Sequence, residues 1–226
     1  MRRKVANPRS MTTQEKERDD HFNRCVEFHG HRCPGLAIGF QAARALMDRL
    51  GVKRAPDEEL VAIVETDACG ADAIQVVTGC TFGKGNFIFL NYGKHAFALA
   101  DRKTGRTVRA CLLPNTLPSN PEHVVLSEKV RNETASPKEL EQYRNLKGER
   151  IQEILVSPFE SLFKIEEISF PIPPEAQILE SKACDFCGEP TKADLLGDLD
   201  GRKACIPCRE KFECEAPSAQ RGVFRQ

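Results

Sequence analysis

Apolar side chains recur every three or four residues in the segment from Gly35 to Leu50. This spacing is typical of a helix with one buried face, and Gly51 is a suitable end because glycine readily adopts the left-handed conformation. Gly39 and Ala43 lie four residues apart within this segment. Their small size predicts that another element packs closely against the helix.

A second long helix is predicted after residue 136. The sequence Ser-Pro-Lys-Glu at residues 136–139 forms a capping box with proline at the first helical position. Apolar residues continue at helical spacing from Leu140 to Leu155 and predict one buried face. A short helix is predicted over residues 72–77, with Gly79 ending it.

Short apolar runs indicate strands. The run LVAIVET from Leu60 is continuous and rich in β-branched residues, which is typical of a strand buried on both faces. Further strands are predicted over residues 86–92, 95–101, 107–113 and 165–170, separated by turns. The pattern predicts an α+β fold whose sheet has several antiparallel members.

The proline-rich segment PIPPEAQ, residues 171–177, breaks both patterns and marks a domain boundary. We predict a core domain over residues 21–172, a linker over 173–181 and a small domain over 182–226. Residues 1–20 show no apolar periodicity, so we predict a mobile arm or the lead-in to a first helix. The chain contains no internal repeat that we recognise.

Charge excludes some partners. The 33 basic and 33 acidic residues cancel, which leaves no overall field to attract nucleic acid or an anionic membrane. We expect a cytoplasmic protein, since the N-terminal segment lacks the apolar core of a signal peptide and no run reaches membrane-spanning length. The ten cysteines are then better explained as metal ligands, redox groups or buried apolar residues than as disulfides.

Four of these cysteines form two CxxC pairs near the C-terminus, namely Cys184 with Cys187 and Cys205 with Cys208. Seventeen residues separate the pairs, a spacing typical of a tetrahedral zinc site. Four thiolates leave no open position, so this zinc is predicted to be structural. Iron fits the same ligands, and Cys214 is either a spare thiol or a replacement ligand.

Nucleic-acid binding by this small domain is not favoured. Eight basic and eight acidic residues balance between Lys182 and Gln226, and aromatic residues are few. Basic residues close to the cysteines are explained by the negative charge of four thiolates. Two unrelated CxxC pairs are the alternative interpretation, which the spacing disfavours.

A second group of metal-ligand residue types lies in the segment FHGHRCPG. His29, His31 and Cys33 alternate, so they would share one side of an extended segment. Pro34 can begin the following helix, whose N-terminal N–H groups would favour the thiolate of Cys33. Cys33 is therefore the best candidate nucleophile, although capping and packing would also explain these residues.

Two more cysteines lie in turns, Cys69 in ETDACGAD and Cys80 in TGCTFGKGN. Asp67 or Asp72 could accept a proton or orient a metal-bound histidine, and Lys84 could stabilise a thiolate or an anion. Residues 79–85 resemble a phosphate-binding loop but have one residue too few and no following Ser or Thr. We therefore reject nucleotide binding by this loop.

The segments FHGHRCPGLAIGF, ETDACGADAIQVVTGCTFGKGNFIF and NYGKHAFALADRKTGR resemble the FmdE family, which takes its name from a component of formylmethanofuran dehydrogenase. The resemblance covers roughly residues 20–170, and the CxxC pairs match the zinc finger that some members carry. It implies a thioredoxin-like α+β core with a mixed sheet flanked by helices, followed by a treble-clef-like zinc finger.

The resemblance also implies a site, which maps onto His29, His31, Cys33, Cys69 and Cys80 and can hold a metal. The predicted reactive residues are Cys33, His31, Cys80, Asp67 and Lys84. The family name comes from gene neighbourhood with a molybdenum or tungsten enzyme, so the resemblance implies an association with that enzyme complex and names no reaction.

Three functions remain open. The first is a zinc-containing accessory protein of redox or one-carbon metabolism, and the second is a non-catalytic adaptor that binds a partner enzyme. The third, a zinc-dependent hydrolase, lacks the HExxH signature. We also expect a homodimer, because the Gly39–Ala43 face and strands 95–101 and 107–113 present more apolar surface than one small sheet and few helices can cover.

Overall fold

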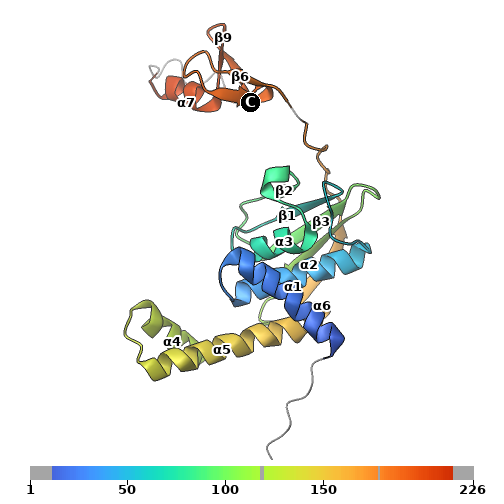
Figure 1. The fold of residues 1–226 in the computed structure, drawn as a ribbon, viewed down its shortest axis with the longest axis vertical. Helices are drawn as coiled ribbons and strands as arrows, with labels where there is room; N and C mark the ends of the chain where they lie inside the picture. Colours follow the sequence, from blue (N-terminus) through green and yellow to red (C-terminus); the bar gives the residue numbers. More distant parts are fainter. Residues whose placement is uncertain (1–11, 118–119, 178, 216–226) are drawn as a thin grey trace, which may run out of the picture. The chain divides into compact units, whose positions relative to one another are not determined.

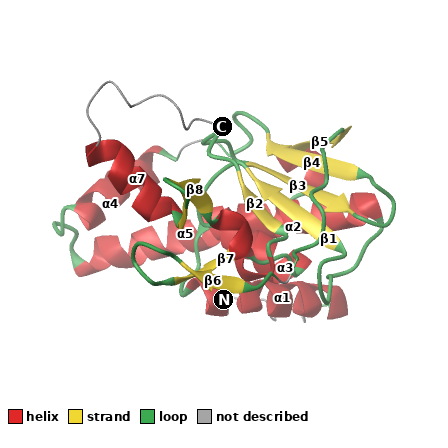
Figure 2. Ribbon diagram, turned by 90° about the horizontal axis from the view of Figure 1, so that it is seen from above, coloured by secondary structure: helices red, strands yellow, loops and turns green. Residues whose placement is uncertain are grey.

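The protein is described by a computed structural model that covers residues 12–117, 120–177 and 179–215 (Figures 1 and 2). The chain divides into two compact units, residues 1–175 and residues 176–226. The division falls within the linker predicted over residues 173–181. The predicted N-terminal arm up to residue 11 and the end of the C-terminal domain after residue 215 lie outside the described residues.

Unit 1–175 contains a mixed five-stranded sheet in the order β2-β1-β3-β4-β5. Its strands are β1 (Leu60–Val64), β2 (Phe87–Phe89), β3 (Ala96–Asp101), β4 (Thr107–Leu112) and β5 (Phe163–Ile168). Only β1 and β2 are parallel among the paired strands of this sheet. The α+β prediction with a mixed sheet is confirmed, whereas the thioredoxin-like assignment stays a prediction.

Both faces of the central strands are buried. Leu60, Ala62 and Val64 of β1 join the large core beneath the helices, together with Phe97 and Leu99 of β3. The alternate residues of the same strands form a second, smaller cluster of Val61, Ile63, Ala98 and Ala100. Residues from the end of β5 and from the chain after it pack against this cluster, namely Ile168, Phe170 and Ile172. Burial on both faces explains why the first strand has a continuous apolar run instead of an alternating one.

Three helices supply much of the large core: α1 (Thr13–His29), α2 (Pro34–Leu50) and α3 (Gly70–Thr78). Helix α1 begins well inside the segment 1–20 that was predicted as an arm. Its first half is almost entirely polar, so it shows no apolar periodicity. Phe22 and Cys25 are fully buried in the core and attach its second half.

A helical hairpin lies between β4 and β5 in the sequence. Helix α4 (Pro121–Arg131), which no sequence pattern predicted, packs on α5 (Pro137–Val156), and α6 (Phe159–Leu162) leads into β5 (Figure 1). The predicted capping box at Ser136 and Glu139 is present. At the other end of α5, the buried Gln41 amide donates to the carbonyl of Ile154 at 3.0 Å and so ties α5 to α2.

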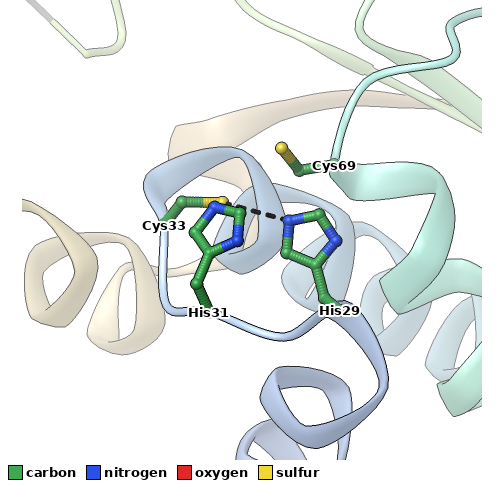
Figure 3. Close-up of side chains that lie close together, drawn as sticks. All are labelled: His29, His31, Cys33 and Cys69. Carbon is green, nitrogen blue, oxygen red and sulfur yellow. Dashed lines mark hydrogen bonds between the residues drawn. The ribbon is translucent and has the colours of Figure 1, made fainter. Parts of the chain in front are cut away.

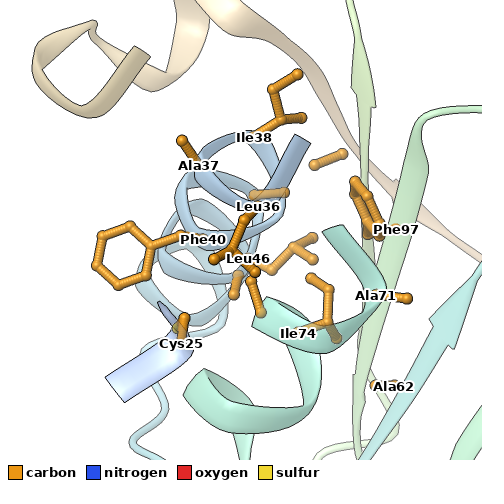
Figure 4. Packing of buried hydrophobic residues seen from close by; sticks show 14 of the residues in the cluster. Cys25, Leu36, Ala37, Ile38, Phe40, Leu46, Ala62, Ala71, Ile74 and Phe97 are labelled. Carbon is orange, nitrogen blue, oxygen red and sulfur yellow. The ribbon is translucent and has the colours of Figure 1, made fainter. Parts of the chain in front are cut away.

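Helices α2 and α3 pack at unusually short range, as the two small residues on α2 predicted. A Cβ atom on Gly39 would lie 2.2 Å from the carbonyl oxygen of Gly70, so neither helix tolerates a side chain at this crossing. Figure 4 shows buried side chains of both helices, among them Leu36 of α2 and Ile74 of α3, in the core. The Gly39–Ala43 face and most of β3 and β4 are thus covered within the chain. The surface on which we based the homodimer is therefore not available, and the homodimer itself stays a prediction.

The described part of unit 176–226 contains two hairpins, a short 3-10 helix and an α-helix. The first hairpin pairs β6 (Ser181–Ala183) with β7 (Pro190–Lys192), and the second pairs β8 (Gly197–Leu199) with β9 (Arg202–Ala204). A short 3-10 helix, η2 (Ala193–Leu195), connects them, and α7 (Ile206–Glu215) follows. Asp200 and Gly201, in the turn between β8 and β9, have positive φ angles of 51° and 74°.

None of the helices in the described ranges has the length and apolar composition that crossing a membrane requires.

Candidate metal centres

Four potential metal ligands meet in unit 1–175. One ligand atom from each of His29, His31, Cys33 and Cys69 lies within 4.8 Å of the other three (Figure 3). Two imidazoles and two thiols suit zinc and other borderline or soft metals. The structure thus brings together four of the five residues that the resemblance implied.

Three of these ligands lie where α1 ends and the chain turns into α2. His29 is the last residue of α1, and Gly30 follows with a φ of 87°, a value that favours glycine. Cys33 is the N-cap of α2, with extended backbone, and its Sγ accepts the N–H of Leu36 at 3.3 Å. The contact predicted between a helix N-terminal N–H group and this sulfur is therefore present.

The fourth ligand depends on glycine packing. Cys69 immediately precedes α3, and its Cβ lies 3.4 Å from the Cβ that a side chain on Gly35 would have. One turn further along α2, Gly39 meets Gly70. These two small residues on α2 let the N-terminus of α3 approach closely enough to place Cys69 beside Cys33.

An acidic residue holds one of the histidines. The Nδ1 atom of His29 lies 2.7 Å from Oδ2 of Asp72, in the first turn of α3. Because a carboxylate can only accept, Nδ1 donates this hydrogen bond, and Nε2 is the nitrogen left to bind a metal ion. Nε2 is directed to the centre and lies 3.9 Å from Cys33 Sγ. A carboxylate that orients a histidine in this way is typical of metal sites.

The two thiols are coupled to each other. Burial raises the pKa of the Cys69 thiol, and the hydrogen bond and charge of the neighbouring Cys33 raise it further. Two adjacent thiolates repel each other unless a cation lies between them. The donor set, its orientation and this repulsion all fit a bound metal ion.

Three other predicted site residues are not in this group. Cys80 is fully buried in the apolar core, where burial raises the pKa of its thiol. Asp67 is exposed, and Lys84 donates from Nζ to the carbonyl of Asp57 at 2.7 Å. The structure therefore separates them from Cys33, and between the two acidic candidates it places Asp72 at the histidine.

Sequence reasoning missed the structural role of two glycines. Gly35 and Gly70 lie in the motifs that carry the family resemblance, but they were not linked to the position of Cys69. The sequence did contain a pattern that indicates this close packing: Gly35 and Gly39 are four residues apart, and a third glycine directly follows Cys69.

The second cluster contains the four cysteines of the two CxxC pairs, again with Sγ atoms within 4.8 Å of one another. Cys184 and Cys187 lie in the β6–β7 turn, where Gly188 has a φ of 77°. Cys205 directly precedes α7 and Cys208 lies in its first turn. The predicted four-thiol set is thus assembled within one small unit.

The charges in this cluster call for a cation. Backbone N–H groups of Cys187 and Cys205 lower the pKa of Cys184 to about 6. The neighbouring Cys205 raises the pKa of Cys208 to about 12, and burial adds to this rise. The surroundings therefore favour ionisation of Cys184 and oppose ionisation of Cys208. All four thiols can ionise together only around a metal ion.

Comparison with known proteins finds a matching family and a similar protein. The family described as "FmdE, Molybdenum formylmethanofuran dehydrogenase operon" matches residues 28–164, which include the whole core cluster and Asp72. A protein of Archaeoglobus fulgidus, described as a "Probable S-adenosyl-L-methionine-binding protein", is 33% identical over 217 residues. The match covers 92% of this chain and 56% of that protein, so the chain spans about half the length of this relative.

A solved structure has the same fold. It is an FmdE-like protein from Syntrophus aciditrophicus, described as related to tungsten formylmethanofuran dehydrogenase, with a TM-score of 0.58 and 23% identity. The likeness covers 86% of this chain and 92% of that one, and at this identity it concerns the fold alone. Because the family match extends over more than half of the sequence, the chain belongs to the FmdE family.

Proposed function

We propose that the protein is a zinc-binding accessory protein of redox or one-carbon metabolism that acts with a formylmethanofuran dehydrogenase-type enzyme. Its reactive centre is the cluster of His29, His31, Cys33 and Cys69, and its C-terminal unit holds a structural zinc. The observation that carries the proposal is the convergence of four ligand atoms within 4.8 Å, one of them from a histidine that Asp72 orients.

The ligands of the core centre differ in exposure, and this difference favours a reactive role. Cys33 is buried, His29 and Cys69 are partly buried, and His31 is exposed. All four residues would hold a metal ion, and His31, as the exposed ligand, would be the one nearest to an external group. A zinc ion bound there supplies Lewis-acid chemistry.

The chain's own residues have separate tasks in this proposal. Cys33 supplies the thiolate, which the N–H of Leu36 stabilises. Asp72 keeps the proton of His29 on Nδ1, so that Nε2 stays available as a ligand. The Asp72 carboxylate is occupied by this hydrogen bond, and this disfavours its use as the general base of a hydrolase.

The alternative is a non-catalytic adaptor that binds a partner enzyme. The observation that favours it is the separate C-terminal unit, whose four-cysteine cluster leaves no ligand position for a substrate. A homodimer, cytoplasmic location, and the thioredoxin-like and treble-clef-like assignments remain predictions. We do not extend S-adenosylmethionine binding to this chain, because the chain spans only 56% of the relative so described.

Replacing Cys33 separates the two functions. We expect Cys33→Ser to bind a formylmethanofuran dehydrogenase-type enzyme as tightly as the wild type does in a pull-down titration. Its effect on the rate of the reconstituted reaction should be lost, because serine is a poor soft-metal ligand and nucleophile. The matched control is Cys111→Ser, a cysteine on β4 outside both clusters. If Cys33→Ser retains the full rate effect, the adaptor function is the correct one.

The role of Asp72 can be measured with a matched pair of variants. We expect Asp72→Asn to weaken cobalt binding at the core centre by about 10- to 100-fold, because the amide orients His29 less well and makes it less basic. Asp67→Asn should leave the affinity unchanged, since Asp67 is exposed and outside the cluster. Cobalt absorption spectra of chelator-treated protein provide the measurement. Equal affinities for the two variants would contradict the orienting role.

A further inference from the structure

A second site is suggested by a cavity of about 780 Å³ in unit 1–175. It lies between α1, α2 and the C-terminal half of α3, and the loop after α2 forms part of its wall. Its volume is typical of sites for small organic molecules. No ligand of either cysteine cluster lines it among the residues that the structure describes.

The lining of this cavity is strongly basic. The lining contains four cationic side chains and one acidic side chain, Asp48. The cationic residues are Arg24, Arg44, Lys53 and Arg54. Among the described side chains, none of these four cations forms an ion pair, although nine such pairs are present elsewhere. Unpaired cations gathered at one concave surface attract anions, because the low-dielectric wall strengthens their field.

One of the cations is held between aromatic rings. The guanidinium of Arg44 lies 5.6 Å from the centroid of the Phe40 ring and 5.5 Å from that of Phe159. Its Nη1 donates to Oε1 of Gln41 at 2.8 Å, which fixes its orientation. Burial lowers the pKa of Arg44, and the charge of Arg18 lowers it further. The charge of Asp48 offsets part of this shift, and the charge of a bound anion would offset it further.

The same surface offers a place for a flat ring. Phe28 lines the cavity with 60% of its surface exposed, and the half-buried Phe159 lines it beside Arg44, whereas Phe40 is buried. Planar guanidinium and phenyl groups both stack favourably on flat unsaturated rings.

We propose that this cavity binds a phosphorylated, flat heteroaromatic compound, with its phosphate on the basic side chains and its ring beside Arg44 and the phenyl rings. Thr81, from the loop at residues 79–85, lines the cavity, but none of the four cations comes from that loop. The site does not depend on the function proposed for the metal centres. The phosphate neutralises the positive charge of the basic side chains, and the ring covers the exposed surface of Phe28.

Two pairs of probes test both halves of the proposal on the metal-loaded full chain. FMN and riboflavin differ only in a phosphate, as do AMP and adenosine. Flavin fluorescence anisotropy serves for the flavin pair, because flavins absorb and emit visible light and protein side chains do not, and calorimetry serves for the adenine pair. We expect the phosphorylated member of at least one pair to bind tenfold or more tightly than its partner, and its affinity to fall as salt rises.

Variants locate the binding. Lys53→Glu and Arg24→Glu alter exposed side chains and should each weaken the phosphorylated probe at least tenfold without changing the melting temperature. Lys103→Glu is the matched control, because it reverses the same charge in the β3–β4 turn outside the cavity. Arg44→Leu should weaken the probe further, and the exposed variants keep the test valid if Arg44→Leu does not fold.

Three outcomes would overturn the proposal. If neither phosphorylated probe binds more tightly than its partner, the anion site is wrong. If inorganic phosphate competes as effectively as the whole probe, the ring has no site. If Lys103→Glu reduces binding as much as Lys53→Glu does, the attraction comes from overall charge and not from this cavity.

Discussion

Serine in place of both Cys184 and Cys205 is expected to unfold the described part of unit 176–226 and to release one tightly bound zinc per chain. The unit has little apolar core of its own, since its buried apolar residues are only Cys184, Leu199, Ala204 and Cys205 among those described. Its folding therefore depends on metal binding, which in zinc-finger peptides contributes about 10–16 kcal/mol. Because unit 1–175 has a separate core, its melting transition should persist.

Elemental analysis and hydrogen exchange provide the measurements for this double variant. Amide protection should be lost throughout the described part of the C-terminal unit and retained in β1, β3 and α2. Cys214→Ser is the control, since Cys214 is exposed and outside the four-cysteine cluster, and it should keep its zinc. Full zinc retention by the double variant would show that these cysteines do not form the site.

Alanine at Gly39 is expected to destabilise unit 1–175 by about 3 kcal/mol or more, a large value for the addition of one methyl group. The new Cβ would lie 2.2 Å from the carbonyl oxygen and 2.4 Å from the Cα of Gly70, and backbone atoms cannot move aside without separating α2 from α3. Since Cys69 precedes Gly70, this separation should also move it from Cys33 and weaken metal binding at the core centre.

The same substitution in another helix should have the opposite effect. A Cβ at Gly148, within α5, would meet no atom within 4 Å. Gly148→Ala is therefore expected to stabilise the protein by about 1 kcal/mol, because alanine is the better helix former. Urea denaturation of metal-free protein and cobalt titration of both variants compare the two effects. If Gly39→Ala is as stable as the wild type, the close crossing of α2 and α3 is not correct.

Local signals were sufficient wherever neighbouring residues decide the conformation. The helix at Pro34–Leu50 was predicted from its spacing and its terminal glycine, and the capping box located the start of α5. The start of α1 was not predicted, because its first half is polar on all sides and is attached to the core only through Phe22 and Cys25. Helix α4 was missed as well; it packs on α5 and has only Leu126 buried.

The sequence by itself determined the C-terminal cysteine cluster and most of the core centre. Each CxxC pair lies within one turn of the chain, and His29, His31 and Cys33 lie within five residues, so short-range geometry brings their side chains together. Only the tertiary structure decided the remaining partners. Cys69 and Asp72 lie at the start of α3, where glycine packing holds them against α2, whereas Cys80 follows the far end of this nine-residue helix. At 1.5 Å per residue that end is about 13 Å away. Which turn of α3 contacts α2 depends on residues that are distant in the sequence, and therefore no local pattern could choose between the two cysteines.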